Sequence, residues 1–314
     1  MRFELTDEQA GFARSLADLL GRSDTVGAAR AWTAGDSGPG LAIWRRLADQ
    51  GVNALVVPED AGGMGGNLVD LCVAHEVLGH ELAVGPWIES SAYLATALTG
   101  AARDAVASGA VATVAVPPRV PRALDADVAE QVFVLADGGL APAAVGDLHG
   151  SVDGTRRLFD VTAEEAGGAS HTDAEAAFDA AALACAAQLL GAGERILEDS
   201  VAYVKQRKQF GREIGSYQAI KHQLADVRIA LDFARPLVFG AALADVPVSA
   251  AKISAVEAAH LAARTGLQVH GAIGYTAEFD LSLWLNRVRA LGTAWGTPAW
   301  HRARVLDVIA RGER

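Results

Sequence analysis

The second half of this chain consists of four long helical blocks, and this pattern restricts the fold more than any other feature. From residue 172 onward the sequence is rich in alanine, and its larger apolar residues recur at helical spacing. Amphipathic helices of this length bury their apolar faces against one another, which predicts a C-terminal four-helix bundle. Pro236 lacks a backbone N–H and is expected to kink or interrupt the second helix. The predicted helices cover about residues 173–208, 217–243, 249–270 and 281–311.

The start of the chain also favours helices. Thr6 followed three residues later by Gln9 has the pattern of a capping box, in which each side chain bonds the backbone of the other residue. This pattern predicts a helix over about residues 6–21. Apolar residues at helical spacing predict two further helices, at about residues 41–50 and 68–82.

The middle of the chain differs from both ends in its amino-acid composition. Between about residues 112 and 166 it contains prolines, glycines and short β-prone runs, which predict a small β region. The predicted fold is therefore mainly α. Three domains are expected: an N-terminal helical domain (1–111), a β domain (112–170) and a C-terminal helical bundle (171–314).

Charge and composition exclude several classes of function. The 27 lysines and arginines against 38 aspartates and glutamates give a net charge of −11, which disfavours nucleic acid and anionic membranes as partners. Neither a membrane span nor a secretory signal is apparent, so a cytoplasmic location is expected. Cys72 and Cys185 lack the spacing of a disulfide framework or a zinc site, and His75 and His80 lie off a common helix face. No metal site is predicted.

Two segments in the predicted bundle resemble a known family. Residues 207–214 read Arg-Lys-Gln-Phe-Gly-Arg-Glu-Ile and lead into Tyr-Gln-Ala-Ile-Lys-His-Gln-Leu-Ala-Asp at 217–226, and residues 268–276 read Gln-Val-His-Gly-Ala-Ile-Gly-Tyr-Thr. Together they resemble the C-terminal half of the acyl-CoA dehydrogenase family. The resemblance implies that family's fold, with an N-terminal helical domain, a central β domain and a four-helix bundle. It also implies the family's reaction, in which a glutamate takes the α proton of an acyl-CoA thioester and FAD accepts the β hydride.

The resemblance further implies that both segments contact FAD held by a neighbouring subunit. The planar guanidinium of Arg207 suits a pyrophosphate, Phe210 would pack on the cofactor, and Gln268 offers an amide to its ADP portion. Gly271 would let the backbone approach the cofactor, and Ala272 stands where the family more often has a second glycine. The candidate cofactor-binding residues are Arg207, Gln209, Phe210, Tyr217, Gln218, Gln268, Gly271, Ala272 and Thr297.

The positions of the family's catalytic base hold residues that have no basic group. Ungapped alignment from the second segment places Trp295 at the usual glutamate position, and an indole cannot accept a proton at neutral pH. A second base position, used by some members, falls on Ala181. Asp179 and Glu175 lie nearby, but a helical side chain one or two positions away points about 100 to 200° away from the required direction. No catalytic residue is predicted on this chain.

The middle of the chain lacks the family's flavin-wrapping segments, so its β domain is reduced. The groups that a subunit lends to a neighbour's FAD are therefore present, while those for its own FAD and substrate are missing. This asymmetry predicts a subunit that pairs with a second, catalytic acyl-CoA dehydrogenase subunit in an α2β2 complex. Such subunits resemble those of actinobacterial steroid catabolism, which act on steroid-derived CoA esters.

Two alternatives remain open from the sequence. The chain could be a self-sufficient homo-oligomeric dehydrogenase with a relocated base, such as Asp179 or Glu175. It could also be a flavin-free scaffold or an acyl-CoA-binding subunit, in which the two segments only hold bundle interfaces together.

Overall fold

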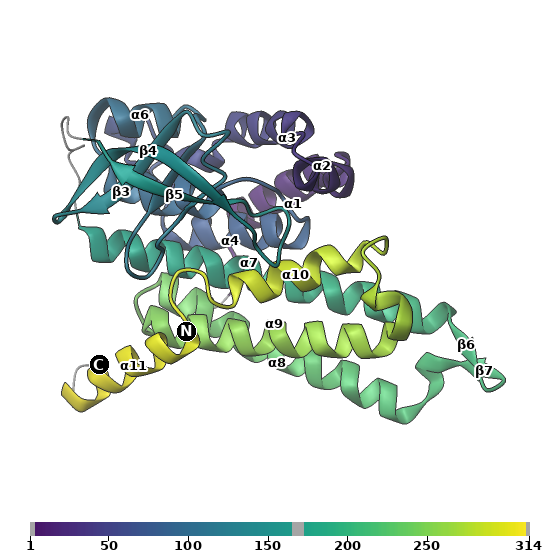
Figure 1. Ribbon diagram of the computed structural model, residues 1–314. Helices are drawn as coiled ribbons and strands as arrows, with labels where there is room; N and C mark the ends of the chain where they lie inside the picture. Colours follow the sequence, from purple (N-terminus) through teal and green to yellow (C-terminus); the bar gives the residue numbers. More distant parts are fainter. Residues whose placement is uncertain (1–3, 165–172, 312–314) are drawn as a thin grey trace.

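The computed structural model describes residues 4–164 and 173–311, and Figure 1 shows their arrangement. The N-terminal region is helical, as predicted. The capping box forms: the backbone N–H of Gln9 donates to Thr6 Oγ1 (3.2 Å), and that of Thr6 donates to Gln9 Oε1 (3.1 Å). The helices here are α1 (Asp7–Gly21), α2 (Thr25–Thr33), α3 (Gly38–Asp49), α4 (Leu68–His80), the π-helix η3 (Ile88–Leu94), α5 (Ala95–Ala97) and α6 (Gly100–Ala107), with 3₁₀ turns η1 (Val52–Ala54) and η2 (Glu59–Ala61).

The β region is a small five-stranded sheet with the strand order β1-β3-β4-β5-β2. β1 and β3 pair in parallel and the other neighbours are antiparallel, with a register shift between Val145 and Leu148 in β4. The sheet has a small apolar cluster of its own, to which the buried side chains of Val134 and Phe159 belong. The strands are β1 (Ala112–Ala115), β2 (Ala123–Leu124), β3 (Gln131–Ala136), β4 (Gly139–His149) and β5 (Leu158–Ala163).

The C-terminal half is a bundle of long helices, drawn in green to yellow in Figure 1. The prediction of one helix over residues 281–311 is wrong, because two helices form there. Gly296 and Pro298 lie at the break between them. Gly296 adopts a left-handed φ of 98°, and proline is favoured at the start of a helix. α8 passes through Pro236 without interruption. The elements are α7 (Ala174–Gln206), β6 (Lys208–Gln209), β7 (Arg212–Glu213), η4 (Ile214–Ser216), α8 (Gln218–Ala242), α9 (Val248–His270), η5 (Gly271–Tyr275), α10 (Leu281–Leu291) and α11 (Pro298–Arg311).

The central helix of the molecule is α7, which packs against α4, α8, α9 and α10. Among the described residues it is the one helix long and apolar enough to cross a membrane, and 89% of its most apolar window is buried inside the protein. A helix that is apolar on all sides is expected wherever protein covers every face. Its burial therefore accounts for its composition.

The crossing of α7 with α4 depends on two glycines. A Cβ placed on Gly191 would lie 1.9 Å from the backbone oxygen of Glu76, and one placed on Gly79 would lie 2.1 Å from that of Gln188. Real side chains do not approach backbone so closely. The two glycines therefore set how near the N-terminal region comes to the bundle.

We expect Gly191→Ala to lower the free energy of unfolding by about 1–3 kcal/mol, because the added methyl must push α4 and α7 apart. Gly11→Ala is the matched control, since its Cβ would meet only the end of Arg14 at 3.8 Å inside α1. The control should raise stability by up to about 1 kcal/mol, as alanine favours helix. Urea denaturation measures both changes. An unchanged or raised stability of Gly191→Ala would contradict the close crossing.

Candidate functional site

The first of the two family-like segments forms an exposed hairpin at one end of the bundle. Arg207 ends α7, and the strands β6 and β7 pair through a two-residue turn at Phe210 and Gly211. Both turn residues have positive φ, 52° and 82°, which is the geometry of the tight hairpins that match strand twist. The turn leaves the Phe210 ring 90% exposed. A large aromatic ring this exposed is suited to contact a partner or a cofactor.

The second segment lies at the same end of the bundle. Gln268 is near the end of α9, and Gly271 opens η5 with φ 63° and ψ −138°, a conformation that glycine tolerates. Figure 1 shows this turn and the β6–β7 hairpin at the same end. The rings of Tyr203 on α7 and His270 on α9 stack with 4.3 Å between their centroids, which ties the two helix ends together.

Two groups at this end, the guanidinium of Arg207 and the backbone at Gly271, are accessible to a ligand. Arg207 is exposed and makes no ion pair with any residue that the structure describes. A Cβ built on Gly271 would meet no atom within 4 Å, so the space beside this backbone is open. The unpaired guanidinium of Arg207, the open backbone at Gly271 and the exposed ring of Phe210 would fit part of a dinucleotide site. Of the predicted residues, Arg207, Gln209, Phe210, Gln218, Gln268 and Ala272 are exposed, and Tyr217 and Gly271 are partly buried.

The structure separates Thr297 from the other candidate cofactor residues. Thr297 is exposed in the loop between α10 and α11, at the opposite end of the bundle from the hairpin (Figure 1). Its Oγ1 accepts a hydrogen bond from the backbone N–H of Trp300 (3.2 Å), which helps to begin α11. Eight of the nine candidates therefore lie at one end and Thr297 at the other.

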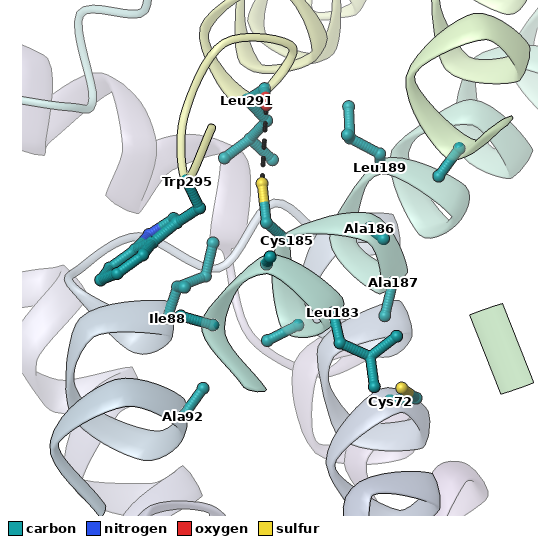
Figure 2. Close-up of a cluster of buried hydrophobic side chains, with 14 of the residues drawn as sticks. Cys72, Ile88, Ala92, Leu183, Cys185, Ala186, Ala187, Leu189, Leu291 and Trp295 are labelled. Atoms are coloured by element: carbon teal, nitrogen blue, oxygen red, sulfur yellow. Dashed lines mark hydrogen bonds between the residues drawn. The ribbon is translucent and has the colours of Figure 1, made fainter. Parts of the chain in front are cut away.

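Trp295, which the ungapped alignment places at the family's usual base position, is fully buried. Its φ of 54° is unusual for a bulky residue, and its carbonyl oxygen accepts a hydrogen bond from His301 Nε2 (3.0 Å). The indole packs against Tyr93 and Phe178, with ring centroids 5.3 and 5.6 Å away. Figure 2 shows the indole beside Ile88 of the π-helix η3, with Cys185 of α7 nearby. The side chain at this position is therefore a buried, packed aromatic ring.

The candidate relocated bases are engaged in ion pairs. Ala181, at the second base position, is buried within α7. Asp179 forms a bidentate pair with Arg304, whose Nη2 lies 2.8 Å from Asp179 Oδ2. Glu175 is held by Arg119 at 2.9 Å. Both carboxylates are therefore engaged by an arginine, and neither is free to approach a substrate as a base.

One buried acid was missed by the sequence reasoning. Glu89 lies in η3, its side chain is 2% exposed, and its Oε2 has no hydrogen-bond partner. Burial raises the pKa of Glu89, and the positive charge of Arg156 opposes this rise. The only signal in the sequence is a single acid inside the apolar run from Trp87 to Leu98. Such an acid is expected to be buried, but its neighbours cannot be derived from the sequence.

Two family profiles and several known proteins match this chain. The profile of the acyl-CoA dehydrogenase C-terminal domain matches residues 171–310, and that of the N-terminal domain matches residues 6–107. The chain is 34% identical over 298 residues to acyl-CoA dehydrogenase IpdE2 of Mycobacterium tuberculosis, covering 90% of this chain and 91% of that protein. It is 32% identical over 306 residues to IpdE2 of Mycolicibacterium smegmatis, covering 94% and 96%.

Solved structures show the same fold. The chain matches one chain of the Tcur3481-Tcur3483 steroid acyl-CoA dehydrogenase with a TM-score of 0.82 and 22% identity, covering 98% of each. It matches one chain of the ChsE4-ChsE5 complex from Mycobacterium tuberculosis with a TM-score of 0.80 and 21% identity, covering 99% of each. The fold, both family profiles and the full-length relatives agree: this chain belongs to the acyl-CoA dehydrogenase family of FAD-dependent oxidoreductases.

Proposed function

We propose that this chain is the non-catalytic subunit of a hetero-oligomeric acyl-CoA dehydrogenase and that it lends FAD-binding residues to a catalytic partner. The observation that carries the proposal is the division of the bundle into two unlike ends. One end exposes the unpaired Arg207 and the ring of Phe210, while the other end buries Trp295 where a base would lie. A subunit that ran the reaction alone would need both ends to be functional.

Arg207 and Gln268 would hold the cofactor through its pyrophosphate and ADP portion, and Phe210 would pack against it. Because the guanidinium of Arg207 keeps its charge at every physiological pH, it can donate two parallel hydrogen bonds to a phosphate. The bound flavin would supply the hydride acceptor. The partner would supply the carboxylate that removes the α proton and the surroundings of the flavin ring.

The kind of complex is proposed from relatives. Two of the structural neighbours bear names of paired subunits, Tcur3481-Tcur3483 and ChsE4-ChsE5, and the first is called a steroid acyl-CoA dehydrogenase. We extend both features to this chain: an α2β2 assembly, and a CoA ester of a steroid-derived acid as substrate. Two free, buried cysteines suit a cytoplasmic location, where disulfides are rare.

The test is turnover of an acyl-CoA substrate by three samples: this chain, the catalytic subunit, and the two co-expressed. Dehydrogenation is expected only from the co-expressed complex. Activity of this chain alone would favour the self-sufficient homo-oligomer with a relocated base. Full activity of the partner without this chain would favour a scaffold or acyl-CoA-binding subunit that holds no flavin.

A substitution of Trp295 tests whether the site on this chain takes part in the reaction of the complex. We expect Trp295→Phe to leave kcat of the complex within about twofold of the unaltered value, because an indole at this position takes no part in proton transfer. Phenylalanine keeps most of the packing against Tyr93 and Phe178. A large fall in kcat, with the complex still folded, would show that Trp295 acts in turnover.

A further inference from the structure

A cavity of about 470 Å³ lies between the β region and the bundle, beside the former base position. Its walls come from the segments around β2, the loop between β4 and β5, η3, and the end of α10 with the loop that follows. Apolar side chains form much of the lining, among them Val120, Leu124 and Leu158. Its volume falls within the roughly 300–1,000 Å³ of typical ligand pockets.

Polar groups that lack partners line the inner part of this cavity. Glu89 Oε2 and the indole Nε1 of Trp295 are both buried without a hydrogen-bond partner. The guanidinium of Arg156, which also lines the cavity, is 9% exposed, and its Nη2 lies 3.8 Å from Glu89 Oε1, too far for a hydrogen bond. Unpaired buried polar groups are rare in proteins, and each calls for an explanation.

These groups share a chemical character. A guanidinium and an indole N–H can only donate hydrogen bonds, and the protonated carboxyl of Glu89 also donates one. Burial raises the pKa of Glu89 and so favours that protonated form. An acceptor with negative charge would satisfy all three at once.

The charges around the cavity also favour a negatively charged ligand. Arg119 and Arg122 also line it, but each is already neutralised, by Glu175 at 2.9 Å and by Asp160 at 3.0 Å. Arg289 stands at the rim and makes no ion pair with any described residue. Arg156 and Arg289 therefore face the single carboxyl of Glu89, which leaves an excess of positive charge at the cavity in a chain whose net charge is −11.

We propose that this cavity binds a small carboxylate with an apolar body, whose carboxylate group accepts hydrogen bonds from Arg156, Trp295 and Glu89. The planar fork of a guanidinium matches a carboxylate, and the apolar walls would cover a chain or ring of modest size. The site is separate from the exposed hairpin end and uses no group that we assign to flavin binding. The chain would thus keep a ligand site where it lost a catalytic one.

The test is calorimetric titration of octanoate into the full-length protein, in the oligomer in which it purifies. We expect each copy of this chain to bind one octanoate. In Arg156→Gln this binding should be lost or weakened about tenfold to a hundredfold, because the substitution removes charge-assisted hydrogen bonds. Arg122→Gln is the matched control on the same cavity, because Asp160 already engages its guanidinium. The control should change octanoate affinity by less than about threefold.

Two further probes define the ligand class. Octanol keeps the apolar body without the charge, and inorganic phosphate keeps a charge without the apolar body, so both should bind at least about tenfold more weakly. Trp295→Phe removes the indole N–H together with part of the ring and should weaken octanoate binding several-fold, which keeps the test decisive if Arg156→Gln fails to fold. Octanol binding as tightly as octanoate, or octanoate binding unchanged in both variants, would overturn the proposal. Flavin content plays no part in these readouts, so they are independent of the proposed function.

Discussion

Arg287→Met is expected to lower the free energy of unfolding by about 3–5 kcal/mol, because it leaves the carboxylate of Asp153 buried without its charge partner. Arg287 Nε donates to Asp153 Oδ2 (2.6 Å), Nη2 to Thr155 Oγ1 (2.8 Å) and Nη1 to the carbonyl oxygen of Ala83 (3.3 Å). These contacts join α10 both to the loop between β4 and β5 and to the N-terminal region. The guanidinium of Arg287 therefore links α10, the β4–β5 loop and the N-terminal region through hydrogen bonds.

The ionisation of Asp153 supports this reasoning. Burial by itself would raise the pKa of Asp153, but the positive charges of Arg287 and Arg156 and the hydrogen bonds from Arg287 and Thr155 together outweigh it, so the pKa lies below its ordinary value. The matched control is Arg302→Met, which breaks the exposed ion pair with Glu257 (2.7 Å). An exposed pair is worth about 0–1 kcal/mol, so the control should barely change the denaturation midpoint. Equal losses in the two variants would contradict a structural role specific to the buried pair.

Arg207→Ala is expected to weaken FAD binding by the complex about tenfold to a hundredfold, the value of two charge-assisted hydrogen bonds to a phosphate. The side chain is exposed and unpaired among the described residues, so its loss should leave the fold of the chain intact. Flavin absorbance of the purified complex, before and after dialysis, measures the change. Arg207→Lys should recover only part of the affinity, since an ammonium lacks the planar fork.

Arg14→Ala provides the control for that result. Arg14 is also an exposed arginine of a helix, but it lies on α1 in the N-terminal region. Its removal should leave flavin content unchanged. Normal flavin content in the Arg207→Ala complex would count directly against the proposed cofactor contact.

Much of the fold follows from local signals in the sequence. The capping box at Thr6 fixed the start of α1, and the apolar spacing of residues 173–208 and 249–270 predicted α7 and α9 within two residues at each end. These signals work because caps and helical periodicity depend on residues that are close in sequence. Profile matches and full-length relatives then confirmed the family that two short segments had suggested.

The missed features depend on contacts between distant residues. α2 was not predicted, since it is only nine residues long and contains Gly27, although Asp24 caps its start. The break between α10 and α11 relies on left-handed backbone at Trp295 and Gly296, and tryptophan gives no local sign of that conformation. Glu89 meets Trp295 and Arg156 only in the folded chain. Such neighbours are set by tertiary packing, which periodicity does not encode.

The flavin content of this protein, purified alone and then co-expressed with the catalytic subunit, tests the shared-site proposal most directly. Absorbance and mass of the extracted cofactor give the number of flavins per chain. Flavin that appears only on co-expression, one for each pair of unlike chains, is the predicted result. A full flavin complement in the protein purified alone would contradict the proposal.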